Sequence, residues 1–388
     1  MNQGKTVFSQ LMSFFSDYEF NKCVEKYNGN YKTRTFSCRD HFYVMCFAQL
    51  TYRDSLRDIE TCLRALSNKL YHSGIRCAIS KSALAKANEQ RNSSIYFDFA
   101  QTLILEARSL YVKTDPLINE INLMAYALDS TTIDLCLSLF PWAKFRKAKG
   151  AIKLHTLLDL NGSIPTFIDI TNGSTHDVNI LDNLDFETDA MYVMDLGYVD
   201  YDRLFKINLK GSFFITRAKV NMKCKRIYSK SVDKTIGLKY DQTIRLTGIN
   251  SKQDYPEKIR RVKFKDEISG KTYIFITNNF NLTAFQVAQL YKKRWDIELF
   301  FKWIKQNLKI KSFYGNSENA VITQVWIAIS TYLLVAIVKK RLNLDQSPYT
   351  LLQTFSLCLF EKIPINELFM KEKYKEVKVH DTKQLKMF

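Results

Sequence analysis

The sequence predicts an α/β protein: a mixed sheet with helices packed on its faces, a β-rich insertion within that core, and a mostly helical N-terminal domain. Three observations support this fold class. Residues 1–118 carry apolar side chains at helical spacing. Residues 122–217 then alternate short strand-like runs with helical ones, as expected when helices cover a sheet. Residues 218–270 are more polar, and their apolar residues alternate as in half-buried strands.

The N-terminal domain is expected to be an assembly of short helices. Segment 54–66 has apolar residues at a helical period. Ser80 precedes 81–91, where it is expected to cap the start of a second helix. Gly74 lies between these two helices, and the spacing fits both a helix-turn-helix module and a plain helical bundle.

The core, residues 119–343, is expected to run in the order strand, hairpin, helix, strand, helix, strand. These elements are expected at 122–131, 151–173, 177–184, 191–197, 199–210 and 212–217. Asn161-Gly162 inside the second of them is a strong signal for a tight hairpin turn. After the insertion, 271–279 is expected to be another buried strand.

Helices are expected from Ala284 onward, ending in a basic C-terminal tail at 344–388. The apolar run 325–338 is shorter than the roughly 20 residues that span a bilayer and contains two hydroxyl residues, so we expect a buried helix and no membrane partner. The first ten residues lack the apolar region of a signal peptide, which favours a cytoplasmic protein.

Composition points to a polyanionic partner. Lys and Arg number 57 against 39 Asp and Glu, a net charge of +18. Such an excess favours nucleic acid or an anionic membrane surface. The eight cysteines are scattered without a CxxC pair or zinc-finger spacing, so we expect reduced thiols. Five dispersed histidines are too few for a His-rich metal site.

The most distinctive segment is 291–309, YKKRWDIELFFKWIKQNLK. Four of its residues are spaced by three, four and seven positions: Tyr291, Arg294, Glu298 and Lys305. At about 100° per residue, these side chains share one face of a helix. A carboxylate flanked by two cations and a phenol suits a site that holds a metal ion through the carboxylate and phosphates through the cations.

Two aspartates complete a candidate metal site. Asp129 and Asp195 each end an apolar run, where a charge costs several kcal/mol unless it is compensated. With Glu298 they form an all-oxygen ligand set that suits Mg²⁺, with Mn²⁺ as a substitute. Metal ions in such sites support in-line phosphoryl transfer.

Simpler roles stay open for each carboxylate. A strand-end Asp is commonly a helix cap or turn residue, and Ser130 and Thr131 after Asp129 fit such a turn. Glu298 can form a surface ion pair with Arg294 or Lys302. Three further carboxylates lie in the same region: Asp134, Asp159 and Asp169.

With these motifs in order, the sequence resembles insertion-sequence transposases of the DDE class, specifically the insertion sequence four family. The helix keeps every spacing of that family's Tyr-Arg-Glu-Lys signature, YALDSTTIDL (126–135) is similar to its first-Asp motif, and VMDLGYVDYDRL (193–204) to its second. The resemblance covers roughly 120–340 closely. Residues 1–110 look like the N-terminal domain that accompanies this core in one branch.

The resemblance implies an RNase H-like core with Asp129, Asp195 and Glu298 as catalytic and metal-binding residues, the two aspartates on adjacent central strands. It implies a bacterial, nucleoid-associated enzyme that binds terminal inverted repeats and target DNA as a homodimer. Several members stabilise a flipped base with an aromatic residue, often Trp, in the insertion. This chain has no Trp there, which puts hairpin chemistry in doubt; the candidate substitutes are Tyr228, Tyr240 and Phe264.

Basic segments supply candidate DNA contacts. Two stretches without acidic residues, 141–155 and 206–230, flank the segments that carry the two aspartates. The first contributes Arg146, Lys147 and Lys149.

Beside Glu298, we expect Arg294 and Lys305 to hold phosphates and Tyr291 to bond a phosphate oxygen, with Lys302 a weaker candidate. The N-terminal domain offers further cations: Arg53, Arg57, Arg64, Lys81, Lys86 and Arg91.

The sequence therefore predicts a Mg²⁺-dependent DNA transposase that cuts DNA and transfers strands. Two alternatives remain. One is a nuclease of the same fold that does not join strands, which the carboxylates alone do not distinguish. The other is a transposase-derived DNA-binding protein without catalysis, which the presence of all three carboxylates disfavours.

Overall fold

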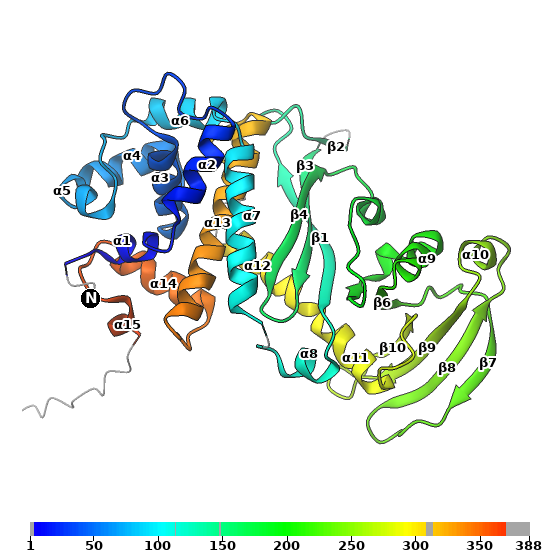
Figure 1. Cartoon of the computed structure of the whole chain (residues 1–388). Coiled ribbons are helices and arrows are strands. Elements are labelled where there is room, and N and C mark those ends of the chain that lie inside the picture. Colours follow the sequence, from blue (N-terminus) through cyan, green and yellow to red (C-terminus); the bar gives the residue numbers. More distant parts are fainter. Residues whose placement is uncertain (1–3, 113, 147–148, 308–312, 370–388) are drawn as a thin grey trace, which may run out of the picture.

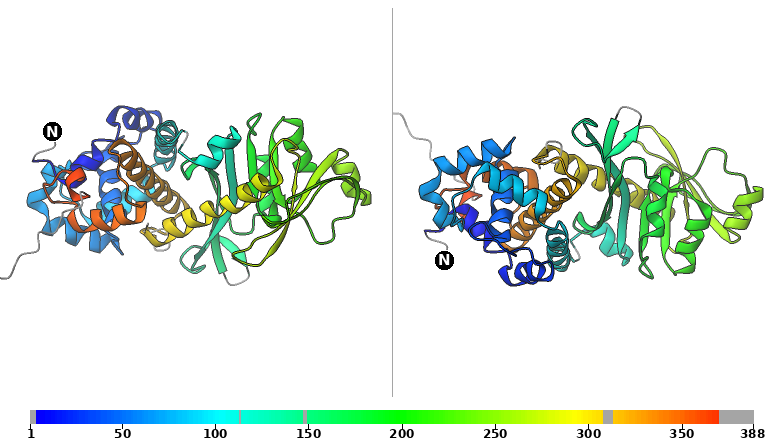
Figure 2. Two further views of the ribbon diagram at one scale, coloured as in Figure 1. Left: turned by 90° about the horizontal axis from the view of Figure 1, so that it is seen from below. Right: turned by 90° about the horizontal axis from the view of Figure 1, so that it is seen from above.

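The computed structural model describes residues 4–112, 114–146, 149–307 and 313–369. It has two parts, one built of helices and one built around a large sheet (Figure 1). Figure 2 shows the same two parts from above and below, with helix α12 (Trp295–Asn307) running between them.

The sheet of the described chain is ten-stranded and mixed. Its strands are β1 (Ala125–Leu135), β2 (Lys144–Arg146), β3 (Lys149–Asp159), β4 (Ile164–Asn172), β5 (Met191–Met194), β6 (Phe213–Arg217), β7 (Cys224–Lys230), β8 (Leu238–Leu246), β9 (Lys258–Lys265) and β10 (Thr272–Thr277). The predicted hairpin is present, because β3 and β4 pair antiparallel on either side of Asn161-Gly162.

The strand order confirms the expected core. Neighbours run β2-β3-β1-β5-β6-β10-β9-β8-β7, and β4 also pairs with β3. β1 is antiparallel to β3 and parallel to β5, and β5 is parallel to β6. This arrangement agrees with an RNase H-like core in which the two aspartates lie on adjacent central strands.

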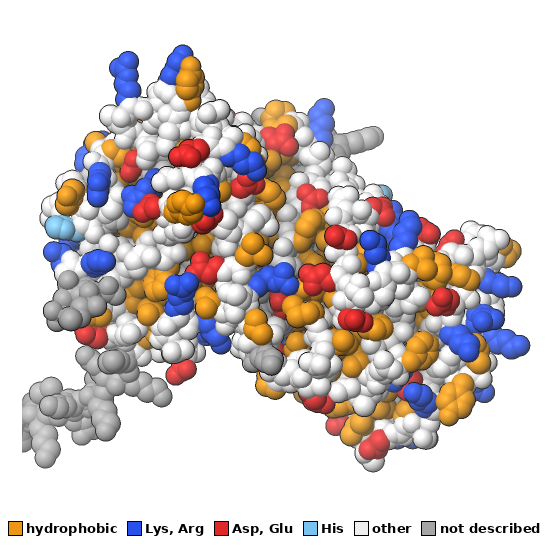
Figure 3. All heavy atoms as spheres, in the orientation of Figure 1, with side chains coloured by type: hydrophobic (Ala, Val, Ile, Leu, Met, Phe, Trp, Pro, Cys, Tyr) orange, Lys and Arg blue, Asp and Glu red, His pale blue; other side chains and the backbone are white. Residues whose placement is uncertain are grey.

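The predicted β-rich insertion extends this same sheet. β7, β8 and β9 form an antiparallel meander, and β9 pairs with β10, which pairs with β6 of the core. A short helix, α10 (Ile249–Asp254), lies between β8 and β9. On the face shown in Figure 3, Lys and Arg side chains gather over the β7–β8 end of the sheet.

Both faces of the central strands are covered, as their continuous apolar sequence predicts. Successive side chains of β5 point to opposite faces. Met191 and Val193 belong to the apolar cluster that includes α11 (Ala284–Lys293). Tyr192 and Met194 belong to the cluster that includes α9 (Tyr201–Leu209) on the other face. The segment 177–184, expected to be helical, contains a 3-10 helix at Asp177–Asp182.

The helical part draws on both ends of the chain. Its N-terminal helices are α1 (Val7–Met12), α2 (Asp17–Lys26), α3 (Cys38–Leu50), α4 (Leu56–Ala65), α5 (Ser67–Leu70), α6 (Lys81–Gln90) and α7 (Ser94–Leu110). The next helix, α8 (Pro116–Ile121), lies beside α11 in the sheet part. The C-terminal helices that join them are α13 (Glu318–Arg341), α14 (Pro348–Cys358) and α15 (Ile365–Leu368). The structure thus shows a helical bundle in which the predicted tail helices take part.

Helix α13 is the centre of that bundle. It packs against α7, α3, α6 and α14. It is long and apolar enough to cross a membrane, yet 94% of its most apolar window is buried inside the protein. The apolar run predicted at 325–338 is therefore a buried core helix, as expected.

Local signals in the N-terminal domain are confirmed. Segment 54–66 forms α4, and the Ser80 hydroxyl accepts from the backbone N–H of Ala83 to cap α6. All eight cysteines are free thiols.

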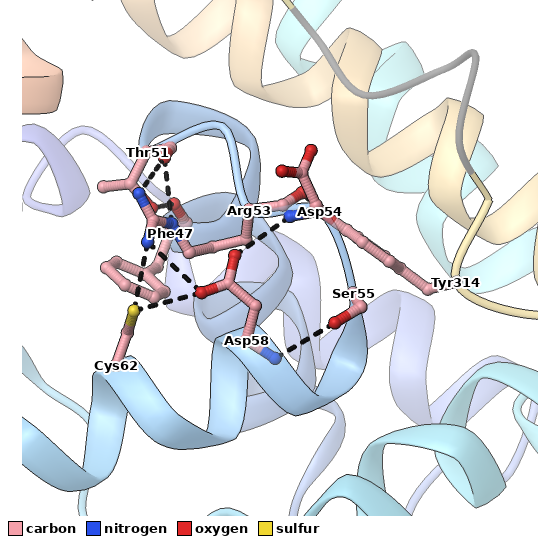
Figure 4. Close-up of polar contacts among 8 residues, drawn as sticks. All are labelled: Phe47, Thr51, Arg53, Asp54, Ser55, Asp58, Cys62 and Tyr314. Carbon is pink, nitrogen blue, oxygen red and sulfur yellow. Dashed lines mark hydrogen bonds and ion pairs between the residues drawn. The ribbon is translucent and has the colours of Figure 1, made fainter.

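Polar contacts tie the segment before α13 to the N-terminal helices. The Tyr314 hydroxyl donates to the carbonyl of Arg53 at 2.6 Å. Arg53 itself bonds the Thr51 carbonyl, Asp58 and Cys62 (Figure 4). The Arg53 guanidinium is thus engaged by groups of the protein itself, which disfavours it as a DNA contact.

Candidate active site

Two adjacent strands bring the predicted aspartates together. β1 and β5 run parallel as far as the pair Leu128 and Met194, so the next residues, Asp129 and Asp195, lie side by side. Asp195 follows β5, as predicted. Asp129 does not end its strand, because β1 continues to Leu135 by pairing with β3. At Asp129 the pairing of β1 with β5 has ended, so the side of β1 that faces β5 has no strand partner from this residue onward.

The predicted single helix over 291–309 is two helices within the described residues. α11 ends at Lys293 and α12 begins at Trp295. At the junction, the N–H of Arg294 is shared between the carbonyls of Leu290 and Tyr291, and the N–H of Ile297 donates to the Arg294 carbonyl at three-residue spacing. The signature therefore spans a junction between helices, with Arg294 at the turning point.

Arg294 joins two of the three carboxylates. Its Nη1 donates to Asp129 Oδ2 at 2.6 Å and its Nη2 donates to Glu298 Oε1 at 2.7 Å. The arginine side chain is 11% exposed, and Asp129 and Glu298 are 20% and 36% exposed. The predicted ion pair between Glu298 and Arg294 is present, but Arg294 is mostly buried and also pairs with Asp129 on β1.

The third carboxylate has its own partners. Asp195 Oδ1 accepts from Arg217 Nη2 at 2.6 Å and from the Tyr291 hydroxyl at 3.1 Å. The hydroxyl of Thr216 donates to the Asp195 carbonyl at 3.1 Å. Tyr291 from the signature helix and Arg217 from β6 thus hold this carboxylate from two sides.

The pKa values of Asp129 and Asp195 are shifted in opposite directions. Burial raises the pKa of Asp129 to about 6, and the neighbouring Asp195 and Glu298 act in the same direction, against the N–H of Ser130 and Arg294. Burial also opposes ionisation of Asp195, but the N–H of Leu196 and the charge of Arg217 lower its pKa below the usual range. Such divergence is characteristic of functional sites.

A polar network lies behind Asp129. Asp177 Oδ1 accepts from the Ser130 hydroxyl at 2.7 Å and from Lys153 Nζ at 3.1 Å. His155 is fully buried, and its Nε2 forms a hydrogen bond with the Thr171 hydroxyl at 2.9 Å. The network fixes the backbone beside the catalytic candidate Asp129.

The remaining signature lysine reaches the same strand. Lys305 Nζ donates to the carbonyl of Thr132 on β1 at 2.7 Å, three residues beyond Asp129. Lys302 instead lines a groove with Asp296, Leu299 and other residues of α12, α13 and α14.

The structure places the basic candidates of 141–155 around the β2–β3 turn. Lys149 is exposed at the start of β3. Arg146 ends β2, and Lys147 lies outside the described residues. Of the competing carboxylates, Asp159 lies 3.7 Å from Arg108 and Asp134 is exposed.

The ligand chemistry of the three carboxylates fits a divalent cation. All donors are carboxylate oxygens, the type that Mg²⁺ and Mn²⁺ prefer. Among the residues that the structure describes, no three His, Cys, Asp or Glu side chains are grouped closely enough to hold a metal ion. The Arg294 guanidinium stands between two of the carboxylates, so it supplies there the positive charge that a metal ion would otherwise supply.

Two contributors were not identified from the sequence. Arg217 is one of eight cations in the segment 206–230, and composition alone does not distinguish it from the other seven. Arg217 ends a strand and Asp195 directly follows one. Because the carboxyl ends of parallel strands lie at the same end of a sheet, this position predicts that the two residues are close together. Asp177 lies in the segment that follows β4, and nothing in the neighbouring sequence predicts its hydrogen bond with the Ser130 hydroxyl.

Comparison with known proteins agrees with this geometry. A model described as "Transposase DDE domain" matches residues 123–334, which is more than half of the chain. The chain belongs to the DDE transposase family. A second model, described as a domain of unknown function (DUF4372), matches residues 3–76 of the helical part.

Relatives of this DDE transposase carry the names of insertion-sequence transposases. A Sinorhizobium fredii protein named as transposase y4zB is 35% identical over 72% of this chain and 77% of its own length. A Geobacillus stearothermophilus protein, named for the element IS5377, is 29% identical over 54% of this chain and 55% of its own length. A Synechocystis protein named for the element IS4SA is 23% identical over 81% of this chain and 87% of its own length. These matches agree with the insertion sequence four family.

Proposed function

We propose that this transposase binds the terminal inverted repeats of its own insertion sequence, cuts the DNA there and transfers the freed strand to target DNA. One observation carries the proposal: the buried Arg294 joins the carboxylates of Asp129 on β1 and Glu298 on α12, and Asp195 at the end of β5 lies beside Asp129 with Arg217 as its partner. Partly buried acidic groups gathered in a protein of net charge +18 suit a cationic cofactor and a polyanionic substrate.

In this proposal Asp129, Asp195 and Glu298 are the catalytic residues and would hold Mg²⁺, or Mn²⁺ in its place. A divalent cation bound there helps to activate the attacking oxygen and to stabilise the leaving oxygen of an in-line displacement at phosphorus. Strand cleavage and strand transfer are both such displacements, so one site can perform both.

The cationic side chains would then serve the DNA. Arg294 gives up contacts to the carboxylates and binds a phosphate beside them, because its fork of donors matches phosphate oxygens as well as carboxylates. Tyr291 and Arg217 keep Asp195 in place. Lys305 holds α12 against β1 near the phosphate path.

The basic residues farther from the carboxylates would position the duplex. Arg146, Lys147 and Lys149 at the β2–β3 turn supply phosphate contacts, with Lys302 a weaker contributor. The N-terminal domain, 1–118, would bind the DNA ends. Pairing of two ends requires two active sites, so we propose a homodimer in the DNA complex. DNA binding of this kind also implies association with the bacterial nucleoid.

Cleavage of labelled DNA that carries the ends of the element tests the proposal. With Mg²⁺, the wild type is expected to cut and to join strands, whereas Glu298→Gln is expected to bind DNA and leave it intact. Asp134→Asn is a matched control, since it removes an exposed carboxylate from the strand that carries Asp129. Its activity is expected to equal that of the wild type.

The same assay separates the alternatives. Cutting without joined products would replace the transposase proposal with a nuclease. Tight DNA binding without cutting in either Mg²⁺ or Mn²⁺ would overturn the catalytic roles and leave a DNA-binding protein.

A further inference from the structure

A second basic feature lies in the helical part, away from the carboxylates. The loop 27–36 between α2 and α3 faces α6 across a groove of about 560 Å³, which we call the loop groove. Its lining includes cations, amides, hydroxyls and aromatic rings, among them Tyr31, Lys32, Arg34, Lys86, Gln90 and Arg91. Not one residue that lines it is acidic.

Three cations of the loop groove are exposed and make no ion pair within the described chain: Lys32, Arg34 and Lys86. Several other cations of the helical part are engaged in ion pairs. Arg64, for example, pairs with Glu60 at 3.1 Å, and Arg39 pairs with Asp17 at 2.6 Å. Unpaired cations without neighbouring acid in the same groove create a positive potential that favours an anionic ligand.

The loop is preformed by its own hydrogen bonds. Two successive turns close from the N–H of Tyr31 to the Asn28 carbonyl and from the N–H of Thr33 to the Asn30 carbonyl. Asn28 and Lys32 adopt left-handed backbone conformations with φ of 52° and 54°. Binding to a preformed loop costs less conformational entropy than binding to one that must first be ordered.

Arg91 braces the groove and is not a ligand donor. Its side chain donates to the carbonyls of Phe36 and Ser37, and its guanidinium lies 4.9 Å from the centre of the Phe36 ring. These contacts fix the end of the loop against α6. The cations left to contact a ligand are therefore Lys32, Arg34 and Lys86.

The groove also presents an exposed ring. Tyr31 is 74% exposed, and Lys32 Nζ lies 5.2 Å from the centre of its ring. Hydroxyl and amide groups of the lining, such as those of Thr33 and Gln90, add neutral hydrogen-bond donors. Cations, neutral donors and an aromatic face together are the groups that proteins use on sugar–phosphate backbones.

We propose that the loop groove binds the phosphodiester backbone of duplex DNA at a contact separate from the active site. The proposal rests on the proposed function, because the DNA is the substrate of that site. Among ligands with phosphate chemistry, a duplex is favoured over a free anion because the cations come from two elements and face along an open groove.

The groove is connected rigidly to the rest of the enzyme. Asn319 at the start of α13 donates to the carbonyls of Asn88 and Arg91, and its Oδ1 accepts from the N–H of Ser93. These bonds fix the end of α6 to the central helix of the bundle. DNA held in the loop groove would therefore have a defined position relative to α12 and Glu298.

The salt dependence of DNA binding tests the proposal. The full-length protein is titrated onto a labelled duplex without divalent metal, for the wild type and for the triple variant Lys32→Gln, Arg34→Gln, Lys86→Gln. Each lost phosphate contact lowers the slope of log Kd against log salt by about 0.9, so a decrease of roughly two to three is expected. The control variant Lys5→Gln, Arg76→Gln, Lys362→Gln removes the same charge from exposed sites outside the groove and is expected to keep most of the slope.

Equal slopes for the triple variant and the control would overturn the proposal. Binding of inorganic phosphate that is lost in the triple variant, with an unchanged DNA slope, would also overturn it by identifying a free-anion site. Should the triple variant unfold, Arg34→Gln alone is expected to lower the slope by about one. Because no cutting is measured, failure of the catalytic proposal leaves this test unaffected.

Discussion

The buried ion pair between Asp241 and Arg260 links the insertion to the active site. Arg260 on β9 donates to both carboxylate oxygens of Asp241 on β8, at 2.9 and 2.8 Å. Its Nη1 also donates to the carbonyls of Asn279 and Leu282, at 3.2 and 2.5 Å. The side chains of the pair are only 4% and 6% exposed. Those carbonyls lie in the loop that leads into α11, which carries Tyr291.

The variant Asp241→Asn leaves the guanidinium of Arg260 buried without its counter-ion. Removing one partner of a buried pair costs about 3–5 kcal/mol, so the free energy of unfolding is expected to fall by that amount. The comparison is Asp202→Asn, which breaks the exposed pair with Lys206, where both side chains are more than half exposed. That change is expected to cost less than about 1 kcal/mol.

Urea denaturation followed by circular dichroism measures both values. A cycle with Asp241→Leu, Arg260→Met and the double variant is expected to give a coupling energy of about 2–3 kcal/mol. The double variant should stay below the wild type in stability, because two carbonyls lose their donor. If Asp241→Asn costs no more than Asp202→Asn, the reasoning about the buried pair is wrong.

Three further outcomes are expected. Burial lowers the pKa of His41 from 6.5 to about 3, so the unfolded chain binds the extra proton and stability falls as pH drops from about 6.5 towards 3, by about 1.4 kcal/mol per unit. Unfolding curves of His41→Gln should lack this slope, and an unchanged slope would contradict the assignment. Asp177→Asn is expected to slow DNA cleavage roughly 10- to 100-fold with DNA affinity retained, through loss of the support to Ser130; an equal loss of affinity would show a general disruption. Tyr291→Phe removes the hydroxyl that bonds Asp195, so cleavage should fall while stability changes by about 1 kcal/mol or less; unchanged cleavage kinetics would refute its role.

The fold class could be predicted because its signals are local. The hairpin at Asn161-Gly162, the cap at Ser80 and the buried run 325–338 each depend on neighbouring residues alone. The length of β1 could not be predicted in this way. Its continuation beyond Asp129 depends on pairing with β3, a tertiary contact that residue propensity does not encode.

The site was predicted to a similar extent. Residue types and spacing indicated Asp129, Asp195 and Glu298, because charges at the ends of apolar runs need compensation. Spacing on an ideal helix did not reveal the junction at Arg294. Nor did it reveal Arg217, whose contact with Asp195 arises only because β6 lies beside β5 in the sheet.

Helix α12 links the two parts of the enzyme. α12 packs on β1 through one side and on α13 and α14 through another. The position of Glu298 therefore depends on both the sheet and the helical bundle. A displacement of α13 would change the geometry of the contact between Arg294 and Glu298. Since Asn319 fixes the start of α13 to the loop groove, DNA bound at the proposed site would be linked through α13 to α12, the helix that carries Glu298. Coupling between end binding and catalysis then requires no further element than α12 and α13.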